Sequence, residues 1–327
     1  VEKTETRLER VSVTRNLRYD KIDSLVTEEA IQSGTLDVEF ADEICWLWRF
    51  AKKLQKDREE VRGRPEPVGR VDWFFALEGE GEDALIRVKG RRRGAPLDLL
   101  VAELMIFANS TWGLWMEEHG TPGIYRSQRM GRVRMSTTPG PHDGLGVVRY
   151  AWSTSPLRRY VDLVNQWQLL ACVKGETPHF KPKSDALFAA MRDFDLTYAA
   201  YAEFQRGMER YWSLRWLKQE GLETIDATVR REDLVKFDHL PLLQRVPSVT
   251  SAKPGQRVRL KIEAIDLLTL GFSCRYLETL SETLVAVDDL DDESELEFIA
   301  TEASNDVAEA EAAAENGEAA ASDSPTV

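Results

Sequence analysis

Several residue types are scarce in this chain of 327 residues, and each shortage excludes a class of protein. The three cysteines, Cys45, Cys172 and Cys274, lie far apart without metal-site spacing, which fits a reducing cytoplasm rather than a disulfide scaffold. Only four histidines are present, so a zinc centre is not expected. No uncharged apolar run reaches the ~18 residues of a membrane span, and the first residues do not resemble a signal peptide. We therefore expect a cytoplasmic protein without a membrane partner.

Basic residues are missing from the C-terminal segment. The chain has 43 Lys and Arg against 56 Asp and Glu, a net charge of −13. Residues 288–327 hold 14 of the acidic residues and no basic ones, whereas the rest of the chain is almost neutral at +1. The overall charge therefore does not exclude a nucleic-acid partner. With so few large apolar side chains to bury, residues 288–327 are expected to be a disordered acidic tail.

The apolar patterning predicts an α+β protein, with mixed strands and packed long helices in residues 1–222 and a small β-barrel of OB type in 223–287. In the first part we expect helices at 41–62, 97–118, 157–173 and 185–221, and strands at 11–17, 71–77 and 84–89. In the second part, the alternation of apolar and charged residues predicts strands at 256–264, 272–277 and 283–287.

One stretch of the sequence contains candidate functional residues at the start of a predicted helix. In Thr154-Ser155-Pro156, a hydroxyl residue and a proline suit the start of a helix, with Pro156 at the first helical position. Arg158 and Arg159 would then lie in the first turn, where free N–H groups and two guanidinium groups could bind a phosphate. The alternative is that the arginines pair with core carboxylates such as Asp162.

This stretch resembles the signature of the ribonuclease II and ribonuclease R (RNB) exoribonucleases, H-x-G-L-x(4)-Y-x(3)-T-S-P-[IL]-R-[RK]-[YF]-x-D-[LM]. The matching positions run from His142, Gly144 and Leu145 through Tyr150 to 154–160, 162 and 163. Upstream, Leu100 to Asn109 resembles the family's V-E-E-x-M-I-x-A-N helix. The resemblance covers roughly residues 8–220, and it extends more loosely to the β-barrel, which family members use to bind RNA.

The resemblance implies that the complete protein is a 3′-to-5′ exoribonuclease, which hydrolyses single-stranded RNA to nucleoside monophosphates with Mg²⁺. DNA is not expected as a substrate. By position, Arg158 would stabilise charge on the phosphate, with Arg159 as its neighbour. The residues expected to contact RNA are Glu103, Tyr125, Arg126, Tyr160 and Trp152.

Some of these residues could instead have a purely structural role. Glu103 could be a helix-face acid paired with an arginine. Most tryptophans, among them Trp46 and Trp48, lie at helical spacing and are expected in the core, whereas Trp152 has a stronger case for stacking on a base.

The family's metal ligands come from an Asp-rich motif, D-x(5)-D-x-D-D, that precedes all the regions matched here. This chain has one D-x-D-D match, Asp289, Asp291 and Asp292, but Thr283 stands at the upstream position, and the match lies in the acidic tail. We therefore expect no metal ligand in this chain and Mg²⁺ ligands outside it. The first residue is Val rather than Met, so we expect an N-terminal segment or a second chain to supply the aspartates. The alternatives are an RNB-like protein that binds RNA without cutting it, or one half of a split enzyme.

Overall fold

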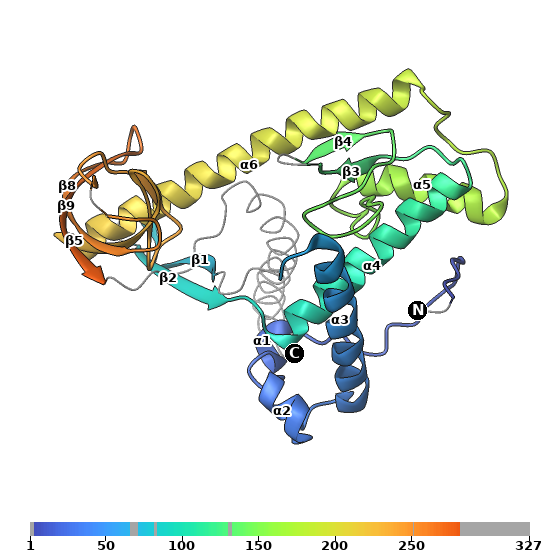
Figure 1. Cartoon of the computed structure of the whole chain (residues 1–327), viewed down its shortest axis with the longest axis horizontal. Coiled ribbons are helices and arrows are strands. Elements are labelled where there is room, and N and C mark those ends of the chain that lie inside the picture. The colour runs from blue at the N-terminus through green and yellow to red at the C-terminus, as the bar shows by residue number, and fades with distance from the viewer. Residues whose placement is uncertain (1–2, 66–70, 82–83, 130–132, 251, 282–327) are drawn as a thin grey trace, which may run out of the picture. The chain divides into compact units, whose positions relative to one another are not determined.

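The computed structural model describes residues 3–65, 71–81, 84–129, 133–250 and 252–281 (Figure 1). The chain divides into two compact units. In the described part, the first unit holds residues 3–65 and 93–196, and the second holds residues 71–92 and 197–281. The hairpin at 71–92 therefore groups with the C-terminal strands, although the sequence pattern had placed it in the first domain.

The first unit is mainly helical. Its helices are α1 (Tyr19–Ile22), α2 (Glu28–Ser33), α3 (Ala41–Arg62), α4 (Pro96–Glu118), α5 (Tyr160–Lys174) and the start of α6 (Asp185–Glu220), and a small antiparallel pair joins β3 (Tyr125–Ser127) to β4 (Arg134–Ser136). The long helices at 41–62, 97–118 and 185–221 are confirmed to within one residue at each end. Gly63 ends α3 in the left-handed conformation, which glycine adopts without strain.

Helix α4 is central to this unit. It packs against α3 on one side and α5 on another (Figure 1). By length and hydropathy alone it could also cross a membrane, a test that a core helix passes as well. Glu103 and Asn109 are both buried on α4. They hold other segments of the unit in place, as described below.

The strand expected at 11–17 is wrong. Residues 3–18 belong to no helix or strand within the described part of the chain. The side chains of Val11 and Val13 are 82% and 83% exposed. An extended segment becomes a strand only when a neighbour pairs with its N–H and C=O groups, and no described segment lies in that position.

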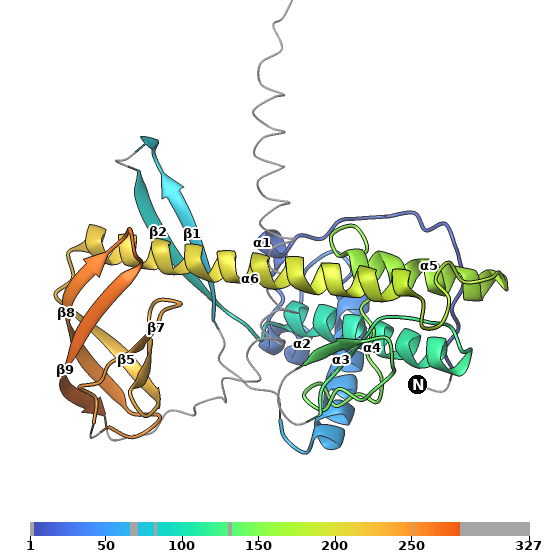
Figure 2. The same ribbon diagram turned by 90° about the horizontal axis from the view of Figure 1, so that it is seen from above.

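The second unit holds an antiparallel sheet in the order β7-β6-β5-β8-β9. Its strands are β5 (Thr224–Arg231), β6 (Leu234–Phe237), β7 (Leu243–Arg245), β8 (Arg257–Asp266) and β9 (Gly271–Ser281). Alternate side chains along β5 and β8, including Ala227, Val229, Val258 and Leu260, are buried in one core, as period-two alternation predicts. The sheet is strongly curved (Figure 2), but β7 and β9 are its two ends, and the described strands form no closed barrel. The strand expected at 283–287 and the acidic tail lie outside the described residues.

A two-stranded hairpin of β1 (Val71–Glu78) and β2 (Leu85–Arg92) belongs to the same unit (Figure 2). The side chain of Gln219, near the end of α6, binds the outer edge of β2. Its Oε1 accepts from Ile86 N at 2.7 Å, and its Nε2 donates to Ile86 O at 3.1 Å. The amide thus pairs with β2 as a neighbouring strand would, and Val88 packs against the core of the sheet.

We expect Gln219→Ala to loosen the hairpin locally, because two hydrogen bonds to one residue are lost at once. The local cost is about 1–2 kcal/mol. Hydrogen exchange of the β2 amides should accelerate, while exchange in β5 and β8 stays unchanged. Lys218→Ala, at an exposed neighbouring position on α6, is the matched control. If both variants exchange alike, Gln219 does not hold the hairpin.

Candidate phosphate-binding site

The loop containing His142, Gly144 and Leu145 of the signature is held by arginines from α3. Arg58 donates from Nη1 to Leu145 O at 2.6 Å, and Arg62 donates from Nη1 to Gly144 O at 3.1 Å. Within the loop, Leu145 N donates to His142 Nδ1 at 3.2 Å. This bond supports the expectation from the sequence that His142 orders the loop.

Gly146 closes this loop against α3. Its φ is +68°, and a Cβ there would overlap with the Arg58 carbonyl oxygen and lie 3.1 Å from its carbonyl carbon. Gly175, the C-cap of α5, has the same φ of +68° but no atom within 4 Å of the equivalent position. The two glycines thus share one backbone conformation and differ in the space around them.

Substitution by alanine should therefore lower the free energy of unfolding by different amounts at Gly175 and Gly146. Gly175→Ala should lower the free energy of unfolding by about 1–2 kcal/mol, the cost of the left-handed conformation. Gly146→Ala adds a clash with backbone that cannot rotate away, about 1–3 kcal/mol more. Urea denaturation of both variants measures the difference. Equal losses would show that α3 and the loop are not in close contact.

Arg58 also explains the position of Glu103. Their side chains form a buried ion pair in which Arg58 Nε donates to Glu103 Oε2 at 2.9 Å and Arg58 Nη2 donates to Oε1. Glu103 is 2% exposed, so its carboxylate has no surface from which to contact RNA. In this structure Glu103 is a helix acid paired with an arginine, which is the alternative that the sequence left open, and its RNA contact stays a prediction. Arg58 lies 45 residues from Glu103, so no local sequence pattern indicates this partner.

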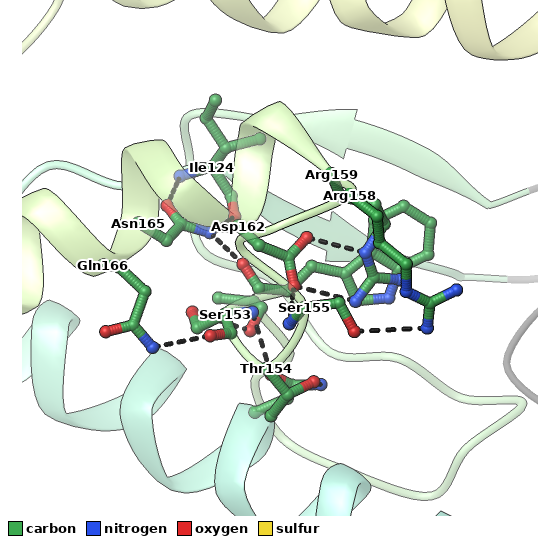
Figure 3. A network of polar contacts seen from close by, with 12 residues as sticks. Ile124, Ser153, Thr154, Ser155, Arg158, Arg159, Asp162, Asn165 and Gln166 are labelled. Carbon is green, nitrogen blue, oxygen red and sulfur yellow. Dashed lines mark hydrogen bonds and ion pairs between the residues drawn. The ribbon is translucent and has the colours of Figure 1, made fainter. Parts of the chain in front are cut away.

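The segment between the loop and α5 is fixed by amide side chains. Asn109 on α4 accepts from Ser153 N at 2.9 Å and donates to Thr154 Oγ1 at 3.2 Å. Asn165 on α5 accepts from Ile124 N at 2.8 Å and donates to the carbonyl oxygens of Ile124 and Trp152. Figure 3 shows part of this network around Ser155. It clamps residues 152–154 between two helices, so the turn that follows has a fixed starting point.

The turn that follows differs from the predicted helix entry. Residues 156–158 form a turn, Arg159 is the N-cap, and α5 begins only at Tyr160. Pro156 is therefore not the first helical residue, and neither arginine lies in the first turn of α5. The reason is Asp162, whose Oδ1 accepts from Ser155 N at 2.8 Å and closes the turn through a side chain.

Arg159 and Arg158 lie in different environments. Arg159 is 4% exposed, and its Nη2 donates to Asp162 Oδ1 at 2.8 Å (Figure 3). Arg159 thus neutralises a buried carboxylate, and its expected catalytic role stays a prediction. Arg158 is exposed, and its Nη2 lies 3.3 Å from Ser155 Oγ. Of the expected pair, Arg158 is the one whose guanidinium faces solvent beside the turn.

Trp152 and Tyr125 are core residues, each 1% exposed. The guanidinium carbons of Arg126 and Arg159 lie 3.8 and 3.9 Å from the centroid of the Trp152 ring. These are cation–π contacts between the two guanidinium groups and the buried ring. Burial also raises the pKa of Tyr125 to about 12. Neither Trp152 nor Tyr125 presents a ring to solvent in this structure, and their contact with RNA stays a prediction.

Tyr160 and Arg126 remain as expected contacts near the turn. Tyr160 is exposed and meets Trp167 edge to face, with ring centroids 6.3 Å apart. Arg126 is partly exposed above Trp152. One tryptophan assigned to the core is instead on the surface: Trp46 is 60% exposed and stacks on Phe50, whereas Trp48 is buried as expected.

The carboxylates of this site do not fit a magnesium ion. Mg²⁺ is bound through carboxylate oxygens that are free to coordinate it, whereas Glu103 and Asp162 are buried and engaged by Arg58 and Arg159. Among the residues that the structure describes, no group of three or more His, Cys, Asp or Glu could hold a metal. The Asp289 to Asp292 match lies outside those residues.

The chain resembles solved exoribonucleases in fold. An active-site mutant of the Dss1 exoribonuclease from Candida glabrata superimposes with a TM-score of 0.64 at 21% identity, covering 81% of this chain and 38% of that one. The apo form of Mycoplasma genitalium RNase R gives a TM-score of 0.61 at 12% identity, covering 79% and 53%.

Sequence comparison agrees. An uncharacterized ribonuclease of Synechocystis is 28% identical over 202 residues, which is 51% of this chain and 30% of that protein. Exoribonuclease 2 of Serratia proteamaculans is 48% identical over 62 residues, or 19% and 9%. The chain thus spans less than a third of these curated relatives. The RNB domain model matches residues 1–131 and 127–175, which include α3, α4 and the signature. The chain therefore belongs to the RNB domain family.

Proposed function

We propose that this chain is part of a 3′-to-5′ exoribonuclease that hydrolyses single-stranded RNA to nucleoside monophosphates. The observation that carries the proposal is the position of Arg158 beside a turn that Asp162, Ser155 and Arg159 hold rigid. Exoribonuclease relatives and an RNase R solved with ribose-methylated single-stranded RNA support RNA as the substrate. We place the reaction in the cytoplasm.

Arg158 is suited to stabilise the charge that develops on a phosphate during hydrolysis. Its guanidinium presents a planar set of N–H donors that matches two phosphate oxygens. The neighbouring Arg159 is neutralised by Asp162, whereas Arg158 is exposed at the turn. A fixed donor of this kind costs no reorganisation when the charge appears. Arg126 and Tyr160 would contact the adjoining nucleotides.

The cofactor of the complete enzyme would be Mg²⁺, bound by aspartates outside this chain. The chemistry it supplies when bound is activation of water and stabilisation of phosphate charge. The aspartates would come from an N-terminal segment or a second chain. The second candidate, an RNB-like protein that binds RNA without cutting it, is favoured by one observation: the described residues contain no carboxylate group fit for the metal.

The experiment is an assay of the protein purified from its own organism through a tag on the C-terminus. Single-stranded RNA labelled at its 5′ end should shorten progressively from the 3′ end in Mg²⁺ and stay intact in EDTA. The released products should be nucleoside monophosphates. Retention of RNA on a filter without any shortening in Mg²⁺ would instead support the binding protein.

A further inference from the structure

An aromatic cluster lies on the exposed side of α5 and on the loop that follows this helix. Tyr160 and Trp167 on α5 are exposed, and so is His179 in the loop. The centroid of the Trp167 ring lies 6.3 Å from that of Tyr160 and 5.4 Å from that of His179. The three rings therefore form one continuous surface, which we call the aromatic platform.

A buried amide fixes the end of the platform that lies in the loop. Gln168 on α5 accepts from Phe180 N at 2.9 Å, and its Nε2 donates to Phe180 O at 2.9 Å. Phe180 is buried, and its ring stacks on Trp167 with centroids 6.5 Å apart. These contacts hold His179 and Phe180 against the helix, so the platform is ordered before a ligand binds.

The platform lies next to Arg158 and is flanked by further cations. Tyr160 follows Arg158 by two residues, and Trp167 lies about two helical turns beyond Tyr160, or ~10 Å along the axis. Residues 174–183 contain three lysines and one glutamate, a net charge of +2, and all three lysines are exposed. Exposed rings interleaved with cations are typical of surfaces that bind single-stranded nucleic acid, because the cations attract phosphates and the rings stack on bases.

We propose that Tyr160, Trp167 and His179 stack on unpaired bases of an RNA strand whose phosphate binds Arg158. This inference rests on the proposed function, which places a phosphate at Arg158, and adds a base-binding site to it. Stacking uses the π face that every base has, so the platform binds single strands with little sequence preference. Paired bases in a duplex are already stacked on each other and do not offer this face.

A protein partner fits this surface less well than RNA does. The centres of protein interfaces are depleted of lysine, whereas exposed lysines and Arg158 flank these rings in the sequence. Two copies of the same face would bring like charges together, which costs free energy. An RNA strand matches both features, because its phosphates are negative and its bases are flat.

Replacement of Trp167 tests the platform through RNA affinity, measured on the native protein in EDTA so that no Mg²⁺-dependent cutting occurs. Trp167→Ala should bind a short single-stranded RNA about 5- to 100-fold more weakly, the effect of losing one stacked base. Trp167→Phe keeps a ring and should recover most of the affinity. Trp46→Ala is the matched control, because Trp46 is an exposed tryptophan on α3, and the affinity should not change. Tyr160→Ala, at a more exposed ring, should act as Trp167→Ala does and replaces it if that variant does not fold.

An abasic RNA separates stacking from an effect on the fold. A strand with the same ribose–phosphate backbone but no bases keeps the phosphate contacts and offers nothing for a ring to stack on. The wild type and Trp167→Ala should therefore bind the abasic strand equally well. If Trp167→Ala weakens binding of the abasic strand as much as binding of the complete RNA, the ring does not contact a base and the proposal is overturned.

The remaining outcomes separate this proposal from the proposed function. If Trp167→Ala changes the sedimentation coefficient but not the RNA affinity, the face binds a second copy, which overturns the platform. If the native protein degrades RNA in Mg²⁺ and Trp167→Ala binds RNA as the wild type does, the platform fails alone. If Trp167→Ala loses affinity only for RNA with bases, but the native protein does not degrade RNA, the platform stands and the proposed function fails alone.

Discussion

Arg158→Ala is expected to reduce RNA hydrolysis by the complete enzyme about 100- to 1,000-fold, the usual effect of removing one charge-stabilising donor. The fold should be unaffected, because Arg158 is exposed and its side chain is 3.3 Å from a serine hydroxyl at the same turn. Its stability should change by no more than about 0.5 kcal/mol. Single-turnover rates and a thermal melt of the same preparation measure both quantities.

Three comparisons make this result specific. Arg158→Lys keeps the charge but loses the planar donor set, so its rate should lie between those of the wild type and the alanine variant. Arg192→Ala removes an exposed arginine from α6 that pairs only with its neighbour Asp193 among the contacts described, and the rate should not change. Arg159→Ala should lower the melting temperature, because it leaves the buried Asp162 carboxylate without its cation. Full activity of Arg158→Ala would remove Arg158 from the phosphate.

Arg58→Ala is expected to lower the free energy of unfolding by about 3–5 kcal/mol, the largest loss of stability among these variants. It leaves the buried Glu103 carboxylate without its counter-charge and the Leu145 carbonyl oxygen without the donor 2.6 Å away. For a unit of this size the melting temperature should fall by about 6–20 °C. Urea denaturation of the chain, followed by tryptophan fluorescence, measures the loss.

Removing both charges of the Arg58–Glu103 pair should reduce the free energy of unfolding much less than removing Arg58 alone. Arg58→Met with Glu103→Leu takes away the buried carboxylate together with its partner, and such replacements are often close to neutral. The matched control is Arg87→Ala, which breaks an exposed ion pair with Glu78 at 2.9 Å and should cost under about 1 kcal/mol. If Arg58→Ala costs no more than this control, the buried pair does not hold α3, α4 and the loop together.

Local patterns predicted the long helices well. Apolar residues at steps of three and four, with Gly63 beyond the last turn, placed α3 at 41–62. Alternation placed β8 and β9 within four residues at each end. Both patterns depend only on residues that are close in the sequence, so they predict helices and strands without knowledge of the fold. The same holds for the spacing from His142 to Leu163, by which the family was identified.

The features that local patterns did not predict depend on partners distant in the sequence. Residues 11–17 have the composition of a strand, but pairing requires a neighbour that local sequence does not specify. Glu103, Tyr125 and Trp152 match positions expected to contact RNA, yet all three are buried, Glu103 beside Arg58 and Trp152 beside Arg126. Burial is a property of the packed chain, and no local pattern separates a buried tryptophan from an exposed one.

The sequence by itself determined the family, the long helices and the presence of two adjacent arginines before α5. Only the tertiary structure decided which of the two arginines is buried and which is exposed. Arg159 folds over Asp162, because a buried carboxylate requires a counter-charge within hydrogen-bonding distance. Arg158, one residue earlier, is left at the surface of the turn. The position of the buried Asp162 therefore decides which of the two arginines is buried, and that position depends on the packing of the folded chain.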